Sequence, residues 1–159
     1  MNIKNNKNCK ITINDEVISV SEKEKTADEL FKELGYTVTY VKEQCNHDPL
    51  FGGTKSPNPE IPCAYDLAIE YAKRIDADVI MCTDPDADRC GIVIKNKDGE
   101  YVLYTGNQTG ALLINYVMQE RKRHGLLHEN GVVFDSVVTS SFGADIARSY
   151  GLSTESVLT

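Results

Sequence analysis

The sequence contains no tryptophan, and none of its apolar runs approaches the length of a membrane-spanning helix. A helix needs about 20 apolar residues to cross a bilayer, so we expect no membrane partner. The first ten residues, MNIKNNKNCK, are polar and lack the apolar core of a secretory signal. These two absences favour a cytoplasmic location.

Positive charge is scarce. The chain has 17 Lys and Arg against 24 Asp and Glu, which gives a formal net charge of −7 at pH 7. Nucleic acids and anionic membranes attract basic surfaces, so this balance argues against partners of either kind. The hydrophobic fraction of 41% and the charged fraction of 26% are those of an ordinary globular protein.

The cysteines form no C-x-x-C pair, and their number is odd. They are Cys9, Cys45, Cys63, Cys82 and Cys90. This spacing matches neither a zinc site nor a disulfide framework. We therefore expect reduced thiols, as in a cytosolic protein.

Apolar periodicity and turn residues predict that strands alternate with helices. A strand or hairpin is expected over 10–20, with its turn at 14–15. Thr26 and Glu29 form a capping-box pattern that begins a helix, and Gly35 supplies its end. Further strands are expected at 36–41, 77–82, 90–95, 101–105 and 132–138, and further helices at 64–75, 109–121 and 142–150.

This alternation indicates an α/β fold with a mixed, largely parallel sheet flanked by helices. The segment ADVIMC (77–82) is almost entirely apolar, as expected for a strand covered on both faces. The helix at 109–121 is expected to turn four side chains inward, Leu112, Leu113, Tyr116 and Val117.

Three aspartates follow the apolar strand in the segment CTDPDADRC (82–90). Asp84, Asp86 and Asp88 are spaced two apart, and Arg89 comes directly after them. Ligand sites of open α/β sheets form at the carboxyl ends of strands, and Pro85 favours a turn there. Carboxylates curled around one point offer hard oxygen ligands that suit Mg²⁺, Mn²⁺ or Ca²⁺.

These aspartates allow two other interpretations. An EF-hand loop that begins at Asp84 needs glycine and glutamate where the chain has Arg89 and Lys95, so an EF-hand is excluded. A solvated acidic turn, in which Arg89 pairs with its neighbours, stays open. The chemistry alone favours a divalent-metal site without indicating its purpose.

Two other segments were considered as sites. Ser140 and Ser141 have no nearby histidine and no G-x-S-x-G elbow, so a capping role is expected. The segment TGNQTG (105–110) lacks the lysine of a P-loop, and we interpret it as a strand-to-helix turn with Asn107 as its cap.

The segment TDPDADR, followed by GIVIK, resembles the metal-binding loop of the α-D-phosphohexomutases, the phosphoglucomutase and phosphomannomutase family. The resemblance extends over about 36–159. It includes KEQCNHDPLFGGTKSPNPE before the loop, YVLYTGNQTGALLINYVM after it, and VVTSSFGADIARSYGL further on.

This resemblance implies an isomerase of carbohydrate metabolism that interconverts hexose 1-phosphate and hexose 6-phosphate. A phosphoserine and a bisphosphorylated sugar carry the phosphoryl group in the family. Asp84, Asp86 and Asp88 would hold Mg²⁺, and Arg89 would be the catalytic residue near the phosphoryl group. The hexose phosphate would be the partner of the full-length enzyme.

The resemblance also implies a partial enzyme. The family's serine motif and its sugar-recognition and phosphate-gripping loops are absent. We expect a poorly matched segment at 1–25, the second domain at 26–122 and the start of a third domain at 123–159. The fragment alone is expected to be inactive and to self-associate through exposed surface of the truncated domain. The alternative is a stand-alone, non-enzymatic acidic domain that binds metal or a partner.

Overall fold

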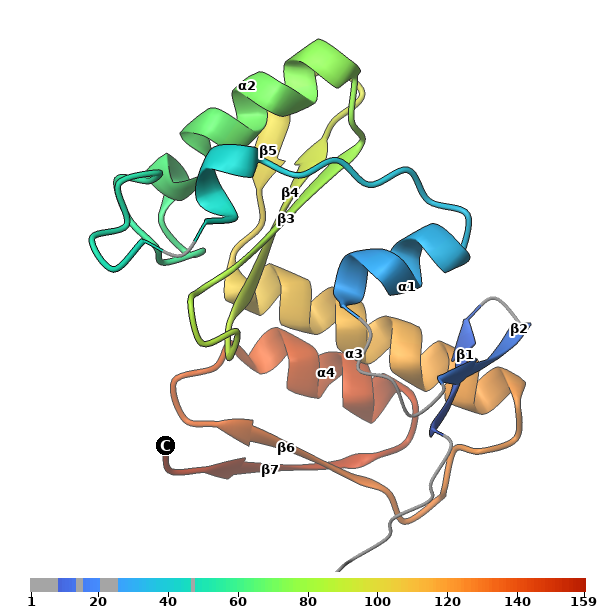
Figure 1. Cartoon of the computed structure of the whole chain (residues 1–159). Helices are drawn as coiled ribbons and strands as arrows, with labels where there is room; N and C mark the ends of the chain where they lie inside the picture. The colour runs from blue at the N-terminus through green and yellow to red at the C-terminus, as the bar shows by residue number, and fades with distance from the viewer. Residues whose placement is uncertain (1–8, 14–15, 21–25, 47) are drawn as a thin grey trace, which may run out of the picture. The chain divides into compact units, whose positions relative to one another are not determined.

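A computed structural model describes residues 9–13, 16–20, 26–46 and 48–159 of the chain. Contacts divide it between Tyr40 and Val41 into two compact units, each of which is described by itself. Figure 1 labels the elements of both units. No helix of the described residues is both long and apolar enough to cross a membrane.

The first unit holds an antiparallel hairpin and one helix. Strand β1 (Cys9–Ile13) pairs with β2 (Glu16–Val20), which confirms the expected strands, although the turn at 14–15 lies outside the described residues. Helix α1 spans Ala27–Glu33, and the Thr26 N–H donates to a Glu29 carboxylate oxygen at 2.9 Å, as the capping-box pattern predicts. Gly35 follows with φ 85°.

The strand predicted over 36–41 is wrong. The structure describes irregular backbone there, and none of the sheets formed by the described residues includes this segment. Instead, the Tyr36 ring lies edge-on to Phe31 with centroids 6.0 Å apart, and Lys32 Nζ lies 5.3 Å from the centroid of the Tyr40 ring. The aromatic residues that favoured a strand therefore pack on α1.

The second unit contains a three-stranded antiparallel sheet in the order β3-β4-β5. Its strands are β3 (Val79–Thr83), β4 (Cys90–Lys95) and β5 (Tyr101–Leu103). The hairpin expected between β4 and β5 is confirmed, with Gly99 in its turn at φ 82°. The 3-10 turns η1 (Lys42–Gln44) and η2 (Pro62–Tyr65) and helix α2 (Asp66–Ile75) precede the sheet.

The core of this sheet lies on one face only. Ala64, Tyr65 and Val93 form its buried centre, and Ile69 and Ile80 pack against them. The other face of β3 is open, since Val79 is 49% and Met81 is 54% exposed. The expectation that β3 is covered on both faces is therefore wrong for this chain.

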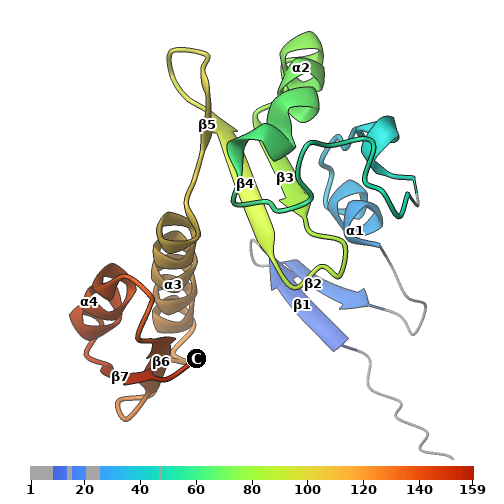
Figure 2. The same cartoon turned by 90° about the vertical axis from the view of Figure 1, so that its left-hand side faces the viewer.

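Two helices and a parallel strand pair complete the second unit. They are α3 (Gly106–Arg123), β6 (Val132–Ser136), α4 (Ser141–Ser149) and β7 (Ser153–Val157). Helix α4 packs against α3 and against both strands (Figure 2). Strand β7 was not expected, because STESV contains a single apolar residue and no alternation.

The α/β class is confirmed, but the expectation of a mixed, largely parallel sheet is met only in part. Among the described residues, β6 and β7 pair in parallel, whereas β1–β2 and β3–β4–β5 are antiparallel. The inward side chains expected on α3 are also wrong: Leu112, Leu113, Tyr116 and Val117 are exposed, and Ala111 is buried instead. The domain limits at 25/26 and 122/123 stay predictions.

Candidate metal centre

The acidic segment forms the tight connection between β3 and β4. Strand β3 ends at Thr83, which pairs with Cys90, the first residue of β4. Within the turn, the Ala87 N–H donates to the Asp84 carbonyl at 3.0 Å, and Ala87 itself has φ 57°, in the left-handed region. The turn therefore folds back on itself and brings its side chains to one end of the hairpin.

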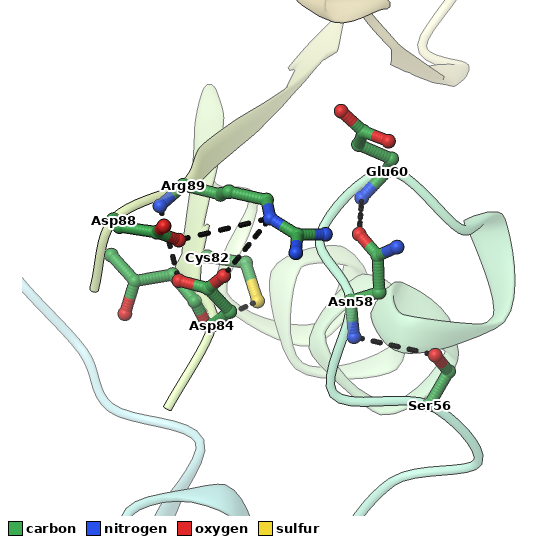
Figure 3. Close-up of polar contacts among 8 residues, drawn as sticks. Ser56, Asn58, Glu60, Cys82, Asp84, Asp88 and Arg89 are labelled. Atoms are coloured by element: carbon green, nitrogen blue, oxygen red, sulfur yellow. Dashed lines mark hydrogen bonds and ion pairs between the residues drawn. The ribbon is translucent and has the colours of Figure 1, made fainter. Parts of the chain in front are cut away.

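The three aspartates meet at this turn. One carboxylate oxygen from each of Asp84, Asp86 and Asp88 lies within 4.8 Å of the others. Asp84 is 8% exposed and is the one buried charged residue among the described residues, whereas Asp86 and Asp88 are exposed. The cluster therefore has one buried carboxylate and two that are open to solvent. Figure 3 shows Asp84 and Asp88 close to each other at the end of the hairpin.

Arg89 holds the cluster from within the same turn. Its backbone N–H donates to Asp84 Oδ1 at 3.1 Å. Its side-chain Nε lies 3.3 Å from Asp84 Oδ2 and 3.7 Å from Asp88 Oδ1 (Figure 3). One residue thus fixes the buried carboxylate through its backbone and partly neutralises two carboxylates through its side chain.

The pKa values of Asp84 and Asp88, the first and last of the three aspartates, move in opposite directions. Burial opposes the ionisation of Asp84, but the hydrogen bond from the Arg89 backbone, the hydrogen bond with Asp88 and the nearby Arg89 charge together outweigh it and lower the pKa. A hydrogen bond with Asp84 raises the pKa of Asp88, and the negative charges of Asp86 and Asp84 raise it further. The cluster therefore carries more negative charge than its protein surroundings balance.

A second loop supports the strand that follows the turn. The Tyr65 hydroxyl donates to the Pro59 carbonyl at 2.8 Å, and both residues are buried against Gly91 of β4. A Cβ on residue 91 would overlap the Tyr65 hydroxyl and lie 2.6 Å from the Pro59 carbonyl oxygen. The segment SPNPE (56–60) therefore packs on β4 through Pro59. Figure 3 shows Asn58 of this segment hydrogen-bonded to Ser56 and Glu60 within its own loop.

The sequence does not predict this support. Pro59 lies in the segment KEQCNHDPLFGGTKSPNPE and Tyr65 in the helix expected over 64–75, and neither position indicates a contact with the other. The available signal was Gly91 itself, because glycine inside a strand often marks the close approach of another part of the chain.

The donor set fits a hard divalent cation. Three carboxylate oxygens gathered at one point are the ligands that Mg²⁺ and Ca²⁺ prefer. The pKa of Asp88 is raised by its hydrogen bond with Asp84 and by the negative charges of Asp86 and Asp84, so the three carboxylates lie close enough to interact. The residues present are therefore suitable for holding a metal.

Ser140 and Asn107 have structural roles at the starts of helices. Ser140 is the N-cap of α4, and its hydroxyl accepts from the Phe142 N–H at 3.2 Å, which confirms a capping role. Thr105, not Asn107, caps α3. The Asn107 carboxamide oxygen instead accepts from the Ser140 N–H at 3.0 Å and so joins the starts of the two helices.

Comparison with known proteins identifies relatives of the region that contains the cluster. Residues 15–99 match the family model described as phosphoglucomutase/phosphomannomutase, alpha/beta/alpha domain II. A phosphoglucomutase of Staphylococcus epidermidis is 41% identical over 119 residues, which cover 75% of this chain and 21% of the relative. A phosphoglucomutase of Staphylococcus aureus is 39% identical over 134 residues, which cover 82% of this chain and 23% of the relative. The chain thus spans between a fifth and a quarter of the length of these curated relatives.

Proposed function

The chain belongs to the phosphoglucomutase/phosphomannomutase family through its alpha/beta/alpha domain II, and we propose that it is the part of such an enzyme that holds Mg²⁺. The ligands in this proposal are Asp84, Asp86 and Asp88. The observation that carries it is the meeting of their carboxylate oxygens within 4.8 Å, in a turn inside the matched region.

The proposed reaction is the interconversion of hexose 1-phosphate and hexose 6-phosphate. The relatives named phosphoglucomutase support this class of isomerase in carbohydrate metabolism. A bound Mg²⁺ neutralises charge on a phosphoryl group that is being transferred and so lowers the barrier to transfer. We propose a cytoplasmic location, where sugar phosphates are available.

Asp84 is proposed as the anchoring ligand. It is buried, and the hydrogen bond from the Arg89 backbone holds its carboxylate ionised and in place. Asp86 and Asp88 stand exposed at the rim, where they remain open to solvent and to a ligand. One fixed, buried carboxylate beside two exposed carboxylates is the arrangement expected of a site that binds a metal together with a phosphate.

Arg89 is proposed as the catalytic residue that orients the phosphoryl group. Its side chain is 53% exposed, and Figure 3 shows the guanidinium end pointing toward the loop that carries Asn58. A guanidinium offers a fixed fork of donors that matches phosphate oxygens. Because the Arg89 side chain also contacts Asp84 and Asp88, it links phosphate binding to the metal ligands.

The 159-residue chain by itself is proposed to be inactive. Neither the serine that donates the phosphoryl group in the family nor the family's sugar-recognition loop occurs in this sequence. The hexose phosphate would therefore be bound only when the missing parts are supplied. The competing hypothesis, a stand-alone acidic domain that binds metal or a partner without catalysis, shares the metal site but not the reaction.

The proposal is tested by Mn²⁺ binding, followed by electron paramagnetic resonance, in the chain and in Asp86→Asn. We expect the substitution to weaken binding about tenfold or more. Asp98→Asn is the matched control, because Asp98 lies in the exposed turn between β4 and β5 and should leave Mn²⁺ affinity unchanged. Equal Mn²⁺ affinity in the chain and in Asp86→Asn would reduce the cluster to an acidic turn.

The catalytic part is tested separately. The purified chain should not convert glucose 1-phosphate, whereas the substitution Arg89→Ala in a full-length protein carrying this domain should lower turnover. Conversion by the chain alone would contradict the claim of inactivity. Unchanged turnover in the full-length variant would remove Arg89 from the reaction.

A further inference from the structure

The Tyr65 side chain lies against the sheet just before the acidic turn. The pair formed by Cys82 of β3 and Gly91 of β4 is one position from the end of the hairpin. Tyr65 is 1% exposed, and its hydroxyl occupies the space that a side chain on Gly91 would need. On the other strand, Cys82 packs against the buried cluster to which Tyr65 belongs. The cluster therefore holds both strands at this pair.

The Tyr65 hydroxyl is fixed in this place by a second partner. It donates to the Pro59 carbonyl at 2.8 Å, and Pro59 is also buried. The same carbonyl lies close to β4, since a Cβ on Gly91 would be 2.6 Å from its oxygen. A buried carbonyl that loses its donor costs free energy. The hydroxyl, the carbonyl and the strand are therefore held in one arrangement.

The acidic turn beyond this pair is closed by a long hydrogen bond. The distance from the Asp84 backbone N to the Arg89 carbonyl oxygen is 3.4 Å, whereas about 2.9–3.0 Å is usual. Ala87 has φ 57°, a conformation that residues other than glycine keep only when their surroundings impose it. Each end of the turn lies two residues from the Cys82–Gly91 pair, so a shift of that pair moves both ends.

The effect of such a shift differs between divalent cations. Mg²⁺ requires nearly octahedral ligands at about 2.0–2.1 Å, whereas Ca²⁺ accepts about six to eight oxygens at about 2.3–2.6 Å in a flexible geometry. A turn that is held in one arrangement therefore favours Mg²⁺. A turn that can shift loses affinity for Mg²⁺ before it loses affinity for Ca²⁺.

We propose that Tyr65 is a positioning residue that makes the aspartate cluster prefer Mg²⁺ to Ca²⁺. Its hydroxyl is not one of the ligands and acts through the Cys82–Gly91 pair. This inference rests on the proposed function, because it takes the three aspartates as the ligands. Removal of the hydroxyl leaves the ring in place but deprives the Pro59 carbonyl of its donor and opens a gap beside Gly91. The end of the hairpin then becomes looser.

The test compares the chain with Tyr65→Phe. Mg²⁺ and Ca²⁺ are each titrated against bound Mn²⁺, and electron paramagnetic resonance of the released Mn²⁺ gives the two dissociation constants. We expect the Mg²⁺ affinity to fall about three- to tenfold, because Tyr65 acts at one remove from the direct partners of metal ligands, whose loss costs about 10–100-fold. The Ca²⁺ affinity should fall by less than about twofold. The ratio of the Mg²⁺ affinity to the Ca²⁺ affinity should therefore fall.

Tyr101→Phe is the matched control. The Tyr101 hydroxyl also donates to a backbone carbonyl, that of Ala77 at 2.7 Å, and Tyr101 packs against the same buried cluster. It lies at the other end of the sheet, where it pairs with Lys95, the last residue of β4. Both variants should lower the free energy of unfolding in urea, but only Tyr65→Phe should lower the affinity ratio. An equal fall of the ratio in both variants would overturn the proposal.

A second variant displaces the same pair without removing the hydroxyl. Gly91→Ala adds a methyl group against Tyr65 and Pro59 and should also lower the affinity ratio. Circular dichroism checks that the variants are folded. If Asp86→Asn weakens Mn²⁺ binding but the ratio is unchanged in either folded variant, this inference is overturned and the proposed function stands. Equal Mn²⁺ affinity in the chain and in Asp86→Asn would overturn the proposed function, and this inference with it.

Discussion

The Tyr65 hydroxyl and the Pro59 carbonyl are joined by a buried hydrogen bond of 2.8 Å, and both groups lie against Gly91. Gly91 is the second residue of β4, directly beyond the acidic turn. The loop 56–60 thus packs on β4, next to the acidic turn, at a strand position that has no side chain. This contact, which contains no aspartate, supports the strand that follows the aspartate cluster.

Gly91→Ala should destabilise the chain by about 1–3 kcal/mol, the usual cost of overpacking. The added methyl group would overlap the Tyr65 hydroxyl and crowd the Pro59 carbonyl, and neither can move without breaking their hydrogen bond. Urea unfolding measures the change. Gly110→Ala is the control. Nothing lies within 4 Å of its added Cβ, and alanine favours a helix more than glycine does, so the free energy of unfolding should rise by about 0.5–1 kcal/mol. An equal change in the free energy of unfolding in the two variants would contradict the close packing around Gly91.

Asp88→Asn should stabilise the metal-free chain at neutral pH. The pKa of Asp88 is raised above its ordinary value of 3.8 by its hydrogen bond with Asp84 and by the neighbouring negative charges. Its ionised form therefore costs stability above the raised pKa, and this cost disappears as the pH falls through that pKa. Thermal unfolding in a chelator should show a higher Tm for the variant at pH 7, and the difference should vanish in acid.

Asp84→Asn should have the opposite sign. The pKa of Asp84 is lowered, despite burial, by the hydrogen bond from the Arg89 backbone, by the hydrogen bond with Asp88 and by the Arg89 charge. Its ionised form therefore contributes stability above pH 3.8, and this contribution is lost as the pH falls through the lowered pKa. The Tm of Asp84→Asn at pH 7 should be lower than that of the unmodified chain. The same sign for both aspartate variants would contradict the electrostatic account of the cluster.

Arg89→Ala should bind Mn²⁺ more tightly in the isolated chain, although the same change is expected to lower turnover in a full-length enzyme. The Arg89 side chain lies 3.3 Å from Asp84 and 3.7 Å from Asp88 and so competes with a cation for their charge. Because these ion pairs are partly exposed, we expect the Mn²⁺ affinity to rise by only about two- to fivefold. Calorimetric titration measures it, and weaker binding in the variant would mean that Arg89 organises the ligands more than it competes.

Cys45 should react with a thiol reagent faster than Cys82. Cys45 is exposed, whereas Cys82 is partly buried in β3, and burial raises the pKa of its thiol, as does the nearby Cys90. Since the thiolate is the reacting species, both access and pKa slow Cys82. Mass spectrometry of the chain after timed alkylation gives the order, and earlier modification of Cys82 would contradict the packing of β3.

The parts of the fold that the sequence predicts well depend on neighbours along the chain. The capping box of Thr26 and Glu29, the turn at Gly99 and the crowded carboxylates after β3 each follow from residues a few positions apart. Their geometry is set by local hydrogen bonds and backbone conformation, so a short segment contains the needed information.

The parts that were missed depend on distant partners. Helix α3 has two apolar sides. Ala111 and Ile114 lie on the side that faces α4, and the exposed side carries Leu112, Leu113, Tyr116 and Val117. Periodicity shows that two apolar stripes exist, but only the position of α4 decides which stripe is buried. The strand expected over 36–41 fails for the same reason, since a strand needs a partner that local propensity cannot supply.

The three aspartates proposed as metal ligands all lie within one β-hairpin, β3 to β4, closed by a turn of a few residues. Contacts between residues so close in sequence form early in folding, because little chain entropy is lost when they meet. Hairpins of this kind close in microseconds. The assembly of the three carboxylates is therefore a local event, which can precede the docking of the supporting loop and the packing of α4 on α3.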